Sequence, residues 1–403
     1  MRSVELFAGA GGLGLGLSLA GFHPELVVEW DQWCCDTLTR NRERGYPLVN
    51  DWRVVREDVR KVDYGEVPGP VDLVSGGPPC QPFSIGGKHG AFMDDRDMWP
   101  AAADVVRRLA PRAFLFENVK GITRASFINY FQYIQLRLSF PEVLPKRDEQ
   151  WIDHLRRLER HKTKGNTRGL WYKVVARVLN AADHGVPQRR ERVFIVGFRS
   201  DQRQGWSFPE ATHSLDRLLW DQWATGEYWD RHEVPKRDRP AHAGQHETRA
   251  RLLLRAGIEP GFGREKPWRS VRDAIADLPD PERGRRGHHL NHQFQDGAQV
   301  YPGHSGSPID LPAKTLKAGD HGVPGGENML VRPDGTVRYF TVRESARLQT
   351  FPDGYELHGS WTESMRQLGN AVPVRLARVV GASLAGQLIQ GDIDRLSHQG
   401  IAS

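Results

Sequence analysis

The first 120 residues alternate short apolar runs with stretches of helical periodicity. Apolar runs at 4–7, 26–29, 71–74 and 113–116 have the length and composition of buried strands. Helical patterns lie between them, beginning at 13, after 29 and at 96. Strands that alternate with helices predict an α/β fold. We expect a Rossmann-like, mostly parallel twisted sheet with helices on both faces.

The pattern changes further along the chain. A helix is expected at 171–180 and a strand at 192–196, whereas 140–168 is basic, lacks a clear period and looks like an insertion. From 201 to 330 the alternation fades, and Trp, His, Arg, Pro and Gly become frequent. We therefore expect one domain over 1–200, completed by 331–403, and a smaller irregular domain over 201–330.

Two helices are expected in the last part of the chain. The segment 341–350 has Thr341 as an N-cap and Glu344 at the third position, which is the capping-box arrangement. A second, amphipathic helix follows Pro373, a residue favoured at the first helical position. We expect this last helix to return to the first strand–helix unit and pack against it, so that the large domain is discontinuous.

Composition narrows the class of protein. The chain has 403 residues, 38% hydrophobic content, a mean hydropathy of −0.57 and three cysteines. We see no apolar run near the roughly 18 residues of a membrane span. The strand pattern starts at the N-terminus without signal-peptide anatomy, so we expect a cytoplasmic protein. Cysteine pairs of a zinc site are missing although 16 histidines are present, so no metal is expected.

The net charge of +6 is concentrated in one segment. Between Arg231 and Arg286 there are 14 Lys or Arg residues against 9 Asp or Glu residues. Such a surplus suggests a polyanionic partner such as nucleic acid. A solvated basic surface is the alternative.

A glycine-rich segment follows the first expected strand. Gly9, Gly11 and Gly14 match the spacing of a dinucleotide-binding loop, and Glu29 lies about 20 residues on, where a ribose-binding carboxylate is expected. An ordinary glycine-rich turn is the alternative. The strand before the loop, the helix after it and the acidic partner favour a nucleoside-containing cofactor. The spacing does not separate a nicotinamide dinucleotide from S-adenosylmethionine.

A cysteine is presented directly after the expected strand at 71–74, in Gly76-Gly77-Pro78-Pro79-Cys80-Gln81-Pro82-Phe83-Ser84. Prolines fix the backbone there, and glycines let another molecule approach closely. This arrangement suits a nucleophile held toward a substrate. A tight turn with a buried cysteine is the alternative for a single cysteine.

Glu117 follows the strand at 113–116, so it should emerge at the same edge of the sheet as Cys80. A thiolate facing a carboxylic acid can attack an electron-poor carbon while the acid donates a proton or hydrogen bond. A strand-end glutamate that caps a helix is the alternative.

Gln188, Arg190 and Arg192 alternate ahead of the strand at 192–196 and should share one face. Two guanidinium groups there suit a phosphate, a carboxylate or a carbonyl. A salt-bridged strand edge is the alternative.

Together these motifs resemble the DNA (cytosine-5) methyltransferases, in particular the bacterial enzymes of type II restriction-modification systems. The resemblance covers Arg2 to about Leu388 and breaks near 140–168 and over 201–330, which is variable in that family. It rests on blocks in the family's order: the glycine loop with Phe7, Glu29-Trp30, Asp58-Val59, Pro79-Cys80-Gln81, Glu117-Asn118-Val119, Gln188-x-Arg190-x-Arg192, Arg343-Glu344-x-x-Arg347-Leu348-Gln349-x-Phe351-Pro352 and Gln367-Leu368-Gly369-Asn370-Ala371-Val372-Pro373.

The resemblance implies S-adenosylmethionine as cofactor, with S-adenosylhomocysteine as product. Phe7 and Trp30 would contact the adenine, Glu29 the ribose hydroxyls, and Asp58 the adenine amino group. The cofactor-binding residues implied are Phe7, Gly9, Gly11, Gly12, Leu13, Glu29, Trp30, Asp58, Val59, Pro79, Trp99, Asn370 and Val372.

The resemblance also implies a reaction on a cytosine flipped out of duplex DNA. Cys80 would add to C6, and Glu117 would hydrogen-bond N3 and the exocyclic amine. Arg192 would contact O2, and Arg190 the pocket or the flipped phosphate. C5 would then take the methyl group. The base that removes the C5 proton is not identified, and water is one candidate.

By position, 201–330 resembles the family's target-recognition domain. The resemblance also implies that the protein acts as a monomer on a specific duplex DNA site. The expected DNA-binding residues are Gln81, Ser84, Lys88, Gln188, Arg190, Thr315, Gly319 and His321. A structural turn is the alternative around 315–326. The loop 86–90 is expected to close over the base. For the basic stretch 162–168 we expect a surface loop. Contact with backbone phosphates of the DNA is the alternative.

Other functions share parts of this pattern. A tRNA cytosine-5 methyltransferase has the same catalytic blocks, although the long 201–330 segment argues against it. A catalytically silent DNA-binding relative would not need Cys80, Glu117 and Arg192. A nicotinamide dehydrogenase explains the glycine loop but leaves the Pro-Cys loop unexplained. The sequence discloses neither the recognised DNA site nor a partner restriction endonuclease.

Overall fold

The computed structural model describes residues 1–79, 97–165, 168–203, 205–240, 244–259, 263–283, 289–300, 302, 305–318 and 328–400. The chain forms two compact units. Unit 1 comprises Met1–Leu179, Glu191–Pro209 and Ala377–Ser403, and unit 2 comprises Asn180–Arg190 and Glu210–Leu376. Residues 331–376 thus belong to unit 2 of the structure, whereas the sequence pattern assigns them to the same domain as 1–200. The functional division remains a prediction.

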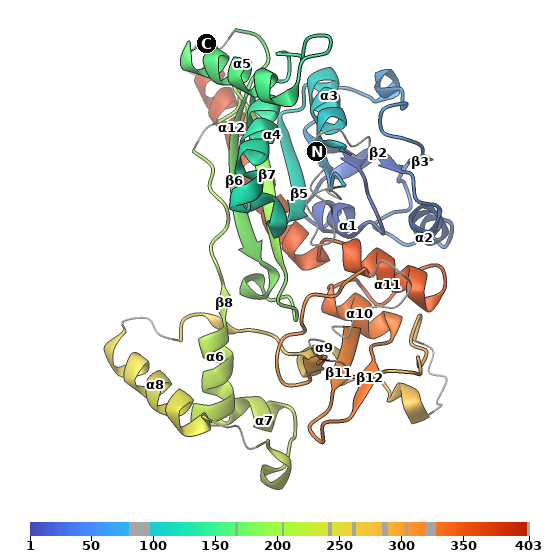
Figure 1. Cartoon of the computed structure of the whole chain (residues 1–403), viewed down its shortest axis with the longest axis vertical. Helices are drawn as coiled ribbons and strands as arrows, with labels where there is room; N and C mark the ends of the chain where they lie inside the picture. The colour runs from blue at the N-terminus through green and yellow to red at the C-terminus, as the bar shows by residue number, and fades with distance from the viewer. Residues whose placement is uncertain are drawn as a thin grey trace. The chain divides into compact units, whose positions relative to one another are not determined.

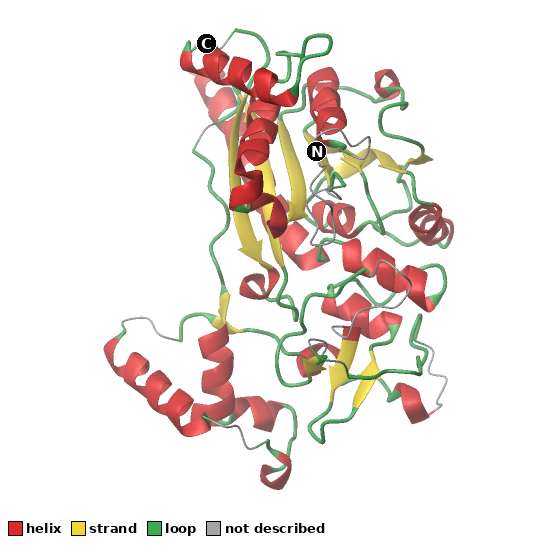
Figure 2. Ribbon diagram, in the orientation of Figure 1, coloured by secondary structure: helices red, strands yellow, loops and turns green. Residues whose placement is uncertain are grey.

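Unit 1 is built on a sheet with the strand order β3-β2-β1-β4-β5-β7-β6 (Figures 1 and 2). The strands are β1 (Arg2–Leu6), β2 (His23–Glu29), β3 (Val54–Arg56), β4 (Leu73–Gly76), β5 (Ala113–Val119), β6 (Tyr172–Asn180) and β7 (Glu191–Arg199). Strands β1 to β5 are parallel, and β7 runs antiparallel to β5. The predicted α/β fold is confirmed.

The strand order reverses between β1 and β4, because the chain leaves β1 toward β2 on one side and returns to β4 on the other. Open α/β sheets bind ligands at the carboxyl ends of the strands at such a switch point. Both the glycine loop after β1 and the Pro-Cys loop after β4 begin there. The topology alone therefore brings the starts of the two loops together.

The core of unit 1 follows from strands that are covered on both faces and are therefore apolar along their length. Leu6, Phe114 and Phe116 are fully buried. Two polar residues of β1 are buried as well, Ser3 and Glu5, and the carboxyl-bearing Glu5 is only 1% exposed. An ionisable side chain is costly to bury in this position, so it indicates a task other than packing.

The helices of unit 1 connect or cover the strands. They are α1 (Gly12–Ser18), α2 (Gln32–Glu43), α3 (Trp99–Leu109), α4 (Ile128–Ser139), α5 (Trp151–Thr163), α12 (Val374–Gly400) and the short 3-10 turns η1 (Tyr64–Glu66), η4 (Lys120–Thr123) and η5 (Ala125–Phe127). Helix α12 packs on α1, where a Cβ on Gly381 would meet Leu17 at 2.8 Å and Ala20 at 3.1 Å. The predicted return of the last helix to the first strand–helix unit is confirmed.

One local prediction is wrong, and a second segment is more regular than its sequence indicates. Residues 171–180, expected as a helix, form β6, in which Tyr172 packs on Phe114 with its ring 5.2 Å away. Sheet pairing and the β-branched Val174 and Val175 outweigh the helical spacing there. The segment 140–168 contains the helix α5, whose buried face includes Leu155 and Leu158. Its many exposed basic residues obscure that apolar face in the sequence.

The segment Trp361–Ser397 is long and apolar enough, by length and composition, to cross a membrane. This differs from the expectation that no apolar run approaches that length. However, 56% of its most apolar stretch is buried inside the structure, as is typical of a core helix.

Unit 2 consists of short elements around a sheet of order β10-β11-β12 and a pair β8-β9. Its elements are η6 (Ala181–His184), β8 (His213–Ser214), α6 (Leu215–Trp220), the π-helix η7 (Asp221–Thr225), α7 (Glu227–Arg231), η8 (Lys236–Asp238), α8 (Gln245–Ile258), β9 (Lys266–Pro267), α9 (Val271–Ile275), η9 (Pro281–Arg283), β10 (Ser307–Pro308), β11 (Met329–Val331), β12 (Val337–Tyr339), α10 (Val342–Leu348) and α11 (Trp361–Asn370). The predicted capping box of α10 is confirmed, with Thr341 and Glu344 each accepting the other's backbone N–H.

Candidate active site

The glycine loop makes the turn that its sequence predicts. Phe7, Gly9 and Gly11 have positive φ angles of 53°, 54° and 85°, a region that favours glycine. A Cβ placed on Gly9 would meet no atom within 4 Å, so space lies over this part of the backbone. Helix α1 begins at Gly12 without a side-chain cap. The loop therefore offers exposed backbone to a ligand at the switch point.

Glu29 joins the loop to the end of β2. Its carboxylate accepts hydrogen bonds from the N–H groups of Gly9, Trp30 and Asp31 at 2.7, 2.8 and 2.8 Å. Burial raises the pKa of Glu29 above its ordinary value, and the three N–H donors oppose this rise. Glu29 thus fixes the shape of the loop in addition to any contact with a ribose.

Residues beside the loop fit a nucleoside. The Trp30 side chain is 73% exposed at the end of β2, so its ring can cover an aromatic base. Asp58 is held by Arg60, with Nη2 to Oδ2 at 2.6 Å, which lowers the pKa of the carboxyl group. Val59, next to it, is buried. Open backbone, an exposed indole and two carboxylates together match the donor and acceptor set of an adenosine.

The second part of the site lies at the ends of β5 and β7. Arg192 pairs with Val119 in the antiparallel ladder, and its guanidinium reaches back to Glu117, with Nε to Oε1 at 2.8 Å. Both side chains are buried, with 11% and 8% of their surfaces exposed. Burial lowers the pKa of Arg192, and the charge of Glu117 partly opposes that effect. The pair is a preorganised buried donor–acceptor system.

The start of the Pro-Cys loop is tied to this pair. Asn118 donates its side-chain N–H to the Pro78 carbonyl at 2.8 Å. A Cβ on Gly77 would lie 3.4 Å from Glu117 Oε2, so this backbone passes beside the carboxylate. Pro79 is exposed. Cys80, Gln81, Ser84, Lys88 and the loop 86–90 lie outside the described residues.

Unit 2 gives Arg190 a different environment from Arg192. Arg190 is fully buried and donates to the carbonyls of Leu316, Gly369 and Ala371 at 3.0, 2.6 and 2.9 Å. It therefore clamps two segments of unit 2 together. Backbone carbonyls within unit 2 thus occupy the Arg190 guanidinium, and a catalytic or DNA-binding role for Arg190 remains only a sequence prediction.

The other predicted residues of unit 2 flank the same clamp. Buried Gln188 accepts from Leu316 N–H at 3.2 Å, and the Thr315 hydroxyl donates to the Arg189 carbonyl at 2.7 Å. Asn370 is exposed at the end of α11, and Val372 is buried. Gly319 and His321 lie outside the described residues.

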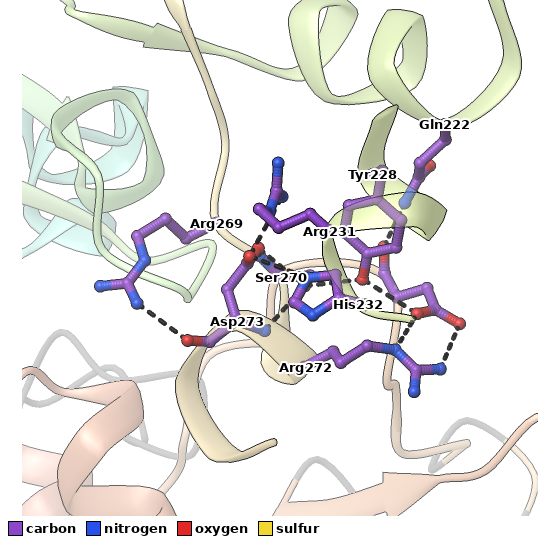
Figure 3. A network of polar contacts seen from close by, with 9 residues as sticks. Gln222, Tyr228, Arg231, His232, Arg269, Ser270, Arg272 and Asp273 are labelled. Carbon is purple, nitrogen blue, oxygen red and sulfur yellow. Dashed lines mark hydrogen bonds and ion pairs between the residues drawn. The ribbon is translucent and has the colours of Figure 1, made fainter. Parts of the chain in front are cut away.

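A network of mostly half-buried polar groups supports the segment that leads to Thr315 (Figure 3). Asp310 accepts from Arg272 Nε at 2.6 Å and from the Tyr228 hydroxyl at 2.9 Å. Asp273, in turn, accepts from His232 at 3.0 Å and from Ser270 N–H at 2.7 Å. Several elements thus hold the backbone near Asp310, only a few residues before Thr315.

Three features go beyond or qualify the sequence prediction. Glu5 accepts from Gly14 N–H at 2.9 Å and supports the glycine loop, and a lone acidic residue within an apolar strand is its signal. Asn118 fixes Pro78, and its position beside Glu117 is its signal. Trp99, expected near the cofactor, is 2% exposed and packs edge-on against Phe116 in the core.

No group of three or more His, Cys, Asp or Glu side chains that could hold a metal ion occurs in the part of the chain that the structure describes.

The fold and the site define a class: a nucleoside-cofactor enzyme of the Rossmann-like type, with a buried carboxylate–guanidinium pair beside a Pro-Cys loop. The model of the C-5 cytosine-specific DNA methylases matches residues 1–140 and 152–386. The chain therefore belongs to this family, and it is a DNA (cytosine-5) methyltransferase. The family and the fold imply S-adenosylmethionine as cofactor and DNA as substrate.

Relatives are similar over nearly the whole chain. The type II methyltransferase M.PspPI of Psychrobacter is 31% identical over 96% of this chain and 79% of its own length. The type II methyltransferase M.Eco47II of Escherichia coli is 32% identical over 94% and 78%. The crystal structure of the S. pombe Dnmt2 methyltransferase has a TM-score of 0.54 at 16% identity, covers 97% of this chain and 98% of its own, and supports the fold alone.

Proposed function

We propose that this enzyme methylates C5 of one cytosine in a specific short duplex DNA site, as the modification enzyme of a bacterial type II restriction-modification system. The type II assignment is supported by the relatives of Psychrobacter and Escherichia coli, which bear that name. The enzyme would act as a monomer in the cytoplasm, where it would protect the DNA from a cognate endonuclease.

The single observation that carries the proposed chemistry is the buried pair of Glu117 and Arg192 beside the start of the Pro-Cys loop. C5 of cytosine is a poor nucleophile. Addition of the Cys80 thiolate to C6 forms an S–C6 bond, moves the electron pair of the C5–C6 double bond between C4 and C5, and places the electron pair of the N3–C4 double bond on N3, where it takes a proton; the resulting enamine makes C5 nucleophilic. The site must therefore stabilise charge on the N3 and O2 side of the ring.

Glu117 and Arg192 provide that stabilisation in the proposed mechanism. Glu117, as an acid, would hold or donate a proton at N3 and would accept from the exocyclic amine. Arg192 would donate to O2 while it orients Glu117. S-adenosylmethionine, when bound, supplies an electrophilic methyl group. After C5 has accepted this group, loss of the C5 proton and release of Cys80 restore the C5–C6 double bond.

The target base has to leave the duplex before it can reach this pair, at a cost of a few kcal/mol. Thr315, Gly319, His321 and the surrounding recognition segment of 201–330 would read the neighbouring bases and bind phosphates. Gln81, Ser84 and Lys88 would contact the flipped nucleotide or its backbone.

Two measurements test this function. Bisulfite sequencing of DNA from cells that express the enzyme should reveal one short sequence with a protected cytosine. The purified protein should then transfer labelled methyl groups to a duplex with that sequence and to no tRNA. Transfer to tRNA in place of duplex DNA would contradict the proposal, and so would scattered methylation without a common sequence.

A further inference from the structure

Among the residues that the structure describes, the buried carboxyl group of Glu5 has one hydrogen-bond partner. Oε1 accepts from Gly14 N–H at 2.9 Å, in the first turn of α1. Oε2 is buried and has no hydrogen-bond partner among the residues that the structure describes. A Cβ on Gly14 would lie 2.2 Å from Oε2 and 2.7 Å from the ring of Trp52, so the absence of a side chain at Gly14 makes room for this carboxyl group.

Glu5 and Glu29 hold the two ends of the same loop. Glu29 binds Gly9 N–H at the start, and Glu5 binds Gly14 N–H at the end. Ser75 of β4 occupies the register position next to Glu5, and its hydroxyl is also buried without a partner within the described part of the chain. Residues in register on neighbouring strands project toward the same face of a sheet. The carboxyl group of Glu5 and the hydroxyl of Ser75 therefore form a small polar region on the sheet, next to the glycine loop.

The surroundings of Glu5 favour its protonated form. Burial raises the pKa of Glu5 to about 8, the negative charge of Glu29 adds to the rise, and the Gly14 N–H opposes it. Glu29 comes from β2. The neighbours from α1, β4 and the segment before β3 are Gly14, Ser75 and Trp52, and these three carry no charge. A cation that binds at the glycine loop would lower the pKa of Glu5 and so favour its ionised form.

We propose that Glu5 is a positioning residue of the cofactor loop that loses its proton when the cationic cofactor binds, which makes the loop prefer S-adenosylmethionine to its uncharged-sulfur product. This inference rests on the proposed cofactor. Two effects of binding compete at Glu5. Further loss of water would raise its pKa, whereas the positive charge of the sulfonium lowers it. Glu5 is already only 1% exposed, so little water remains to be lost and the charge effect dominates.

The linkage fixes the sign of the pH dependence. A group that releases a proton on binding makes the affinity rise with pH through the range of its pKa. We therefore expect S-adenosylmethionine to bind roughly fivefold more tightly at pH 8.5 than at pH 6.5. S-adenosylhomocysteine lacks the sulfonium charge, so its affinity should change much less over the same range.

Isothermal titration calorimetry in two buffers of different ionisation enthalpy tests the proposal directly. Binding of S-adenosylmethionine at pH 7.5 should release about half a proton, and binding of S-adenosylhomocysteine far less. Glu5→Gln keeps the shape and removes the titration, so its proton release should vanish. Glu25→Gln, at a half-buried position of β2, is the matched control and should release as many protons as the unaltered enzyme.

The outcomes separate the two proposals. If neither compound binds, the proposed cofactor is wrong. If S-adenosylmethionine binds without proton release, or if Glu5→Gln releases as many protons as the unaltered enzyme, the role of Glu5 is wrong. If Glu5→Gln does not fold, the comparison of the two compounds on the unaltered enzyme decides, because equal proton release by both would overturn the inference.

Discussion

Arg192 Nε lies 2.8 Å from Glu117 Oε1, and both side chains are buried at the ends of antiparallel strands. The pair stands diagonally across the β5–β7 ladder, so the sheet itself sets its geometry. Gly77 and Asn118 bring the start of the Pro-Cys loop to the same place. The catalytic proposal depends on this arrangement, and it can be tested one residue at a time.

Glu117→Gln should lower kcat by about 100-fold or more, because an amide cannot supply the proton that the attacked ring needs. Glu191→Gln is the matched control. Glu191 is exposed on the same strand as Arg192 and pairs with Lys120 at 2.8 Å, so this variant should keep kcat within about twofold, as expected for an exposed ion pair. Single-turnover methyl transfer measures both. Similar rates for Glu117→Gln and the unaltered enzyme would refute the role of Glu117.

Trp30→Ala should weaken the binding of S-adenosylmethionine roughly three- to tenfold, because it removes an exposed ring that can cover the adenine. The free energy of unfolding should hardly change, since the side chain is 73% exposed. Trp33→Ala, three residues on in α2, is the control and should leave the affinity unchanged. Equal losses of affinity in the two variants would argue against adenine packing on Trp30.

Arg190→Met should lower the free energy of unfolding by about 3 kcal/mol, because it removes the guanidinium that donates to three carbonyl oxygens in the interior of unit 2. Arg189→Met, at the exposed neighbouring position, should change it by less than about 0.5 kcal/mol. Urea denaturation measures both. If Arg190→Met keeps its stability but no longer binds DNA, Arg190 contacts the DNA and is not a structural clamp.

His154 makes the stability of unit 1 depend on pH. Its Nδ1 contacts the Tyr133 hydroxyl at 3.1 Å and its Nε2 contacts the Val143 carbonyl at 2.7 Å, and burial lowers its pKa to about 4. Between pH 6.5 and pH 4 the unfolded chain binds a proton that the folded chain does not. Stability should therefore be complete above about pH 6.5 and fall as the pH drops toward 4.

His154→Gln removes this titration, so its stability should fall less steeply between pH 6.5 and pH 5 than that of the unaltered protein. Denaturant titrations at several pH values compare the two slopes. Parallel slopes would show that another group causes the loss of stability in acid.

Sequence reasoning predicts what local spacing and strand topology determine. Gly9 and Glu29 lie together because a strand, a tight turn and a helix fix their separation, and Glu117 follows from its place at a strand end. The partners of Arg190 lie far along the chain, so alternation with Arg192 could not reveal that carbonyls occupy its guanidinium. The local pattern predicts a helix over 171–180, and it misses the strand because sheet pairing with distant strands has no local signal.

The covalent adduct between Cys80 and C6 is the central claim, and trapping it is the most direct test. A duplex with the recognised site carries 5-fluorocytosine at the target position, so that fluorine replaces the C5 proton that has to leave. In the presence of S-adenosylmethionine, the enzyme should remain covalently bound to this DNA in denaturing gels, and peptide mass spectrometry should place the link at Cys80. Cys80→Ala should form no adduct, whereas the control Cys35→Ala should form it. An unlinked enzyme that still methylates ordinary duplex DNA, or a link at any other residue, would contradict the account.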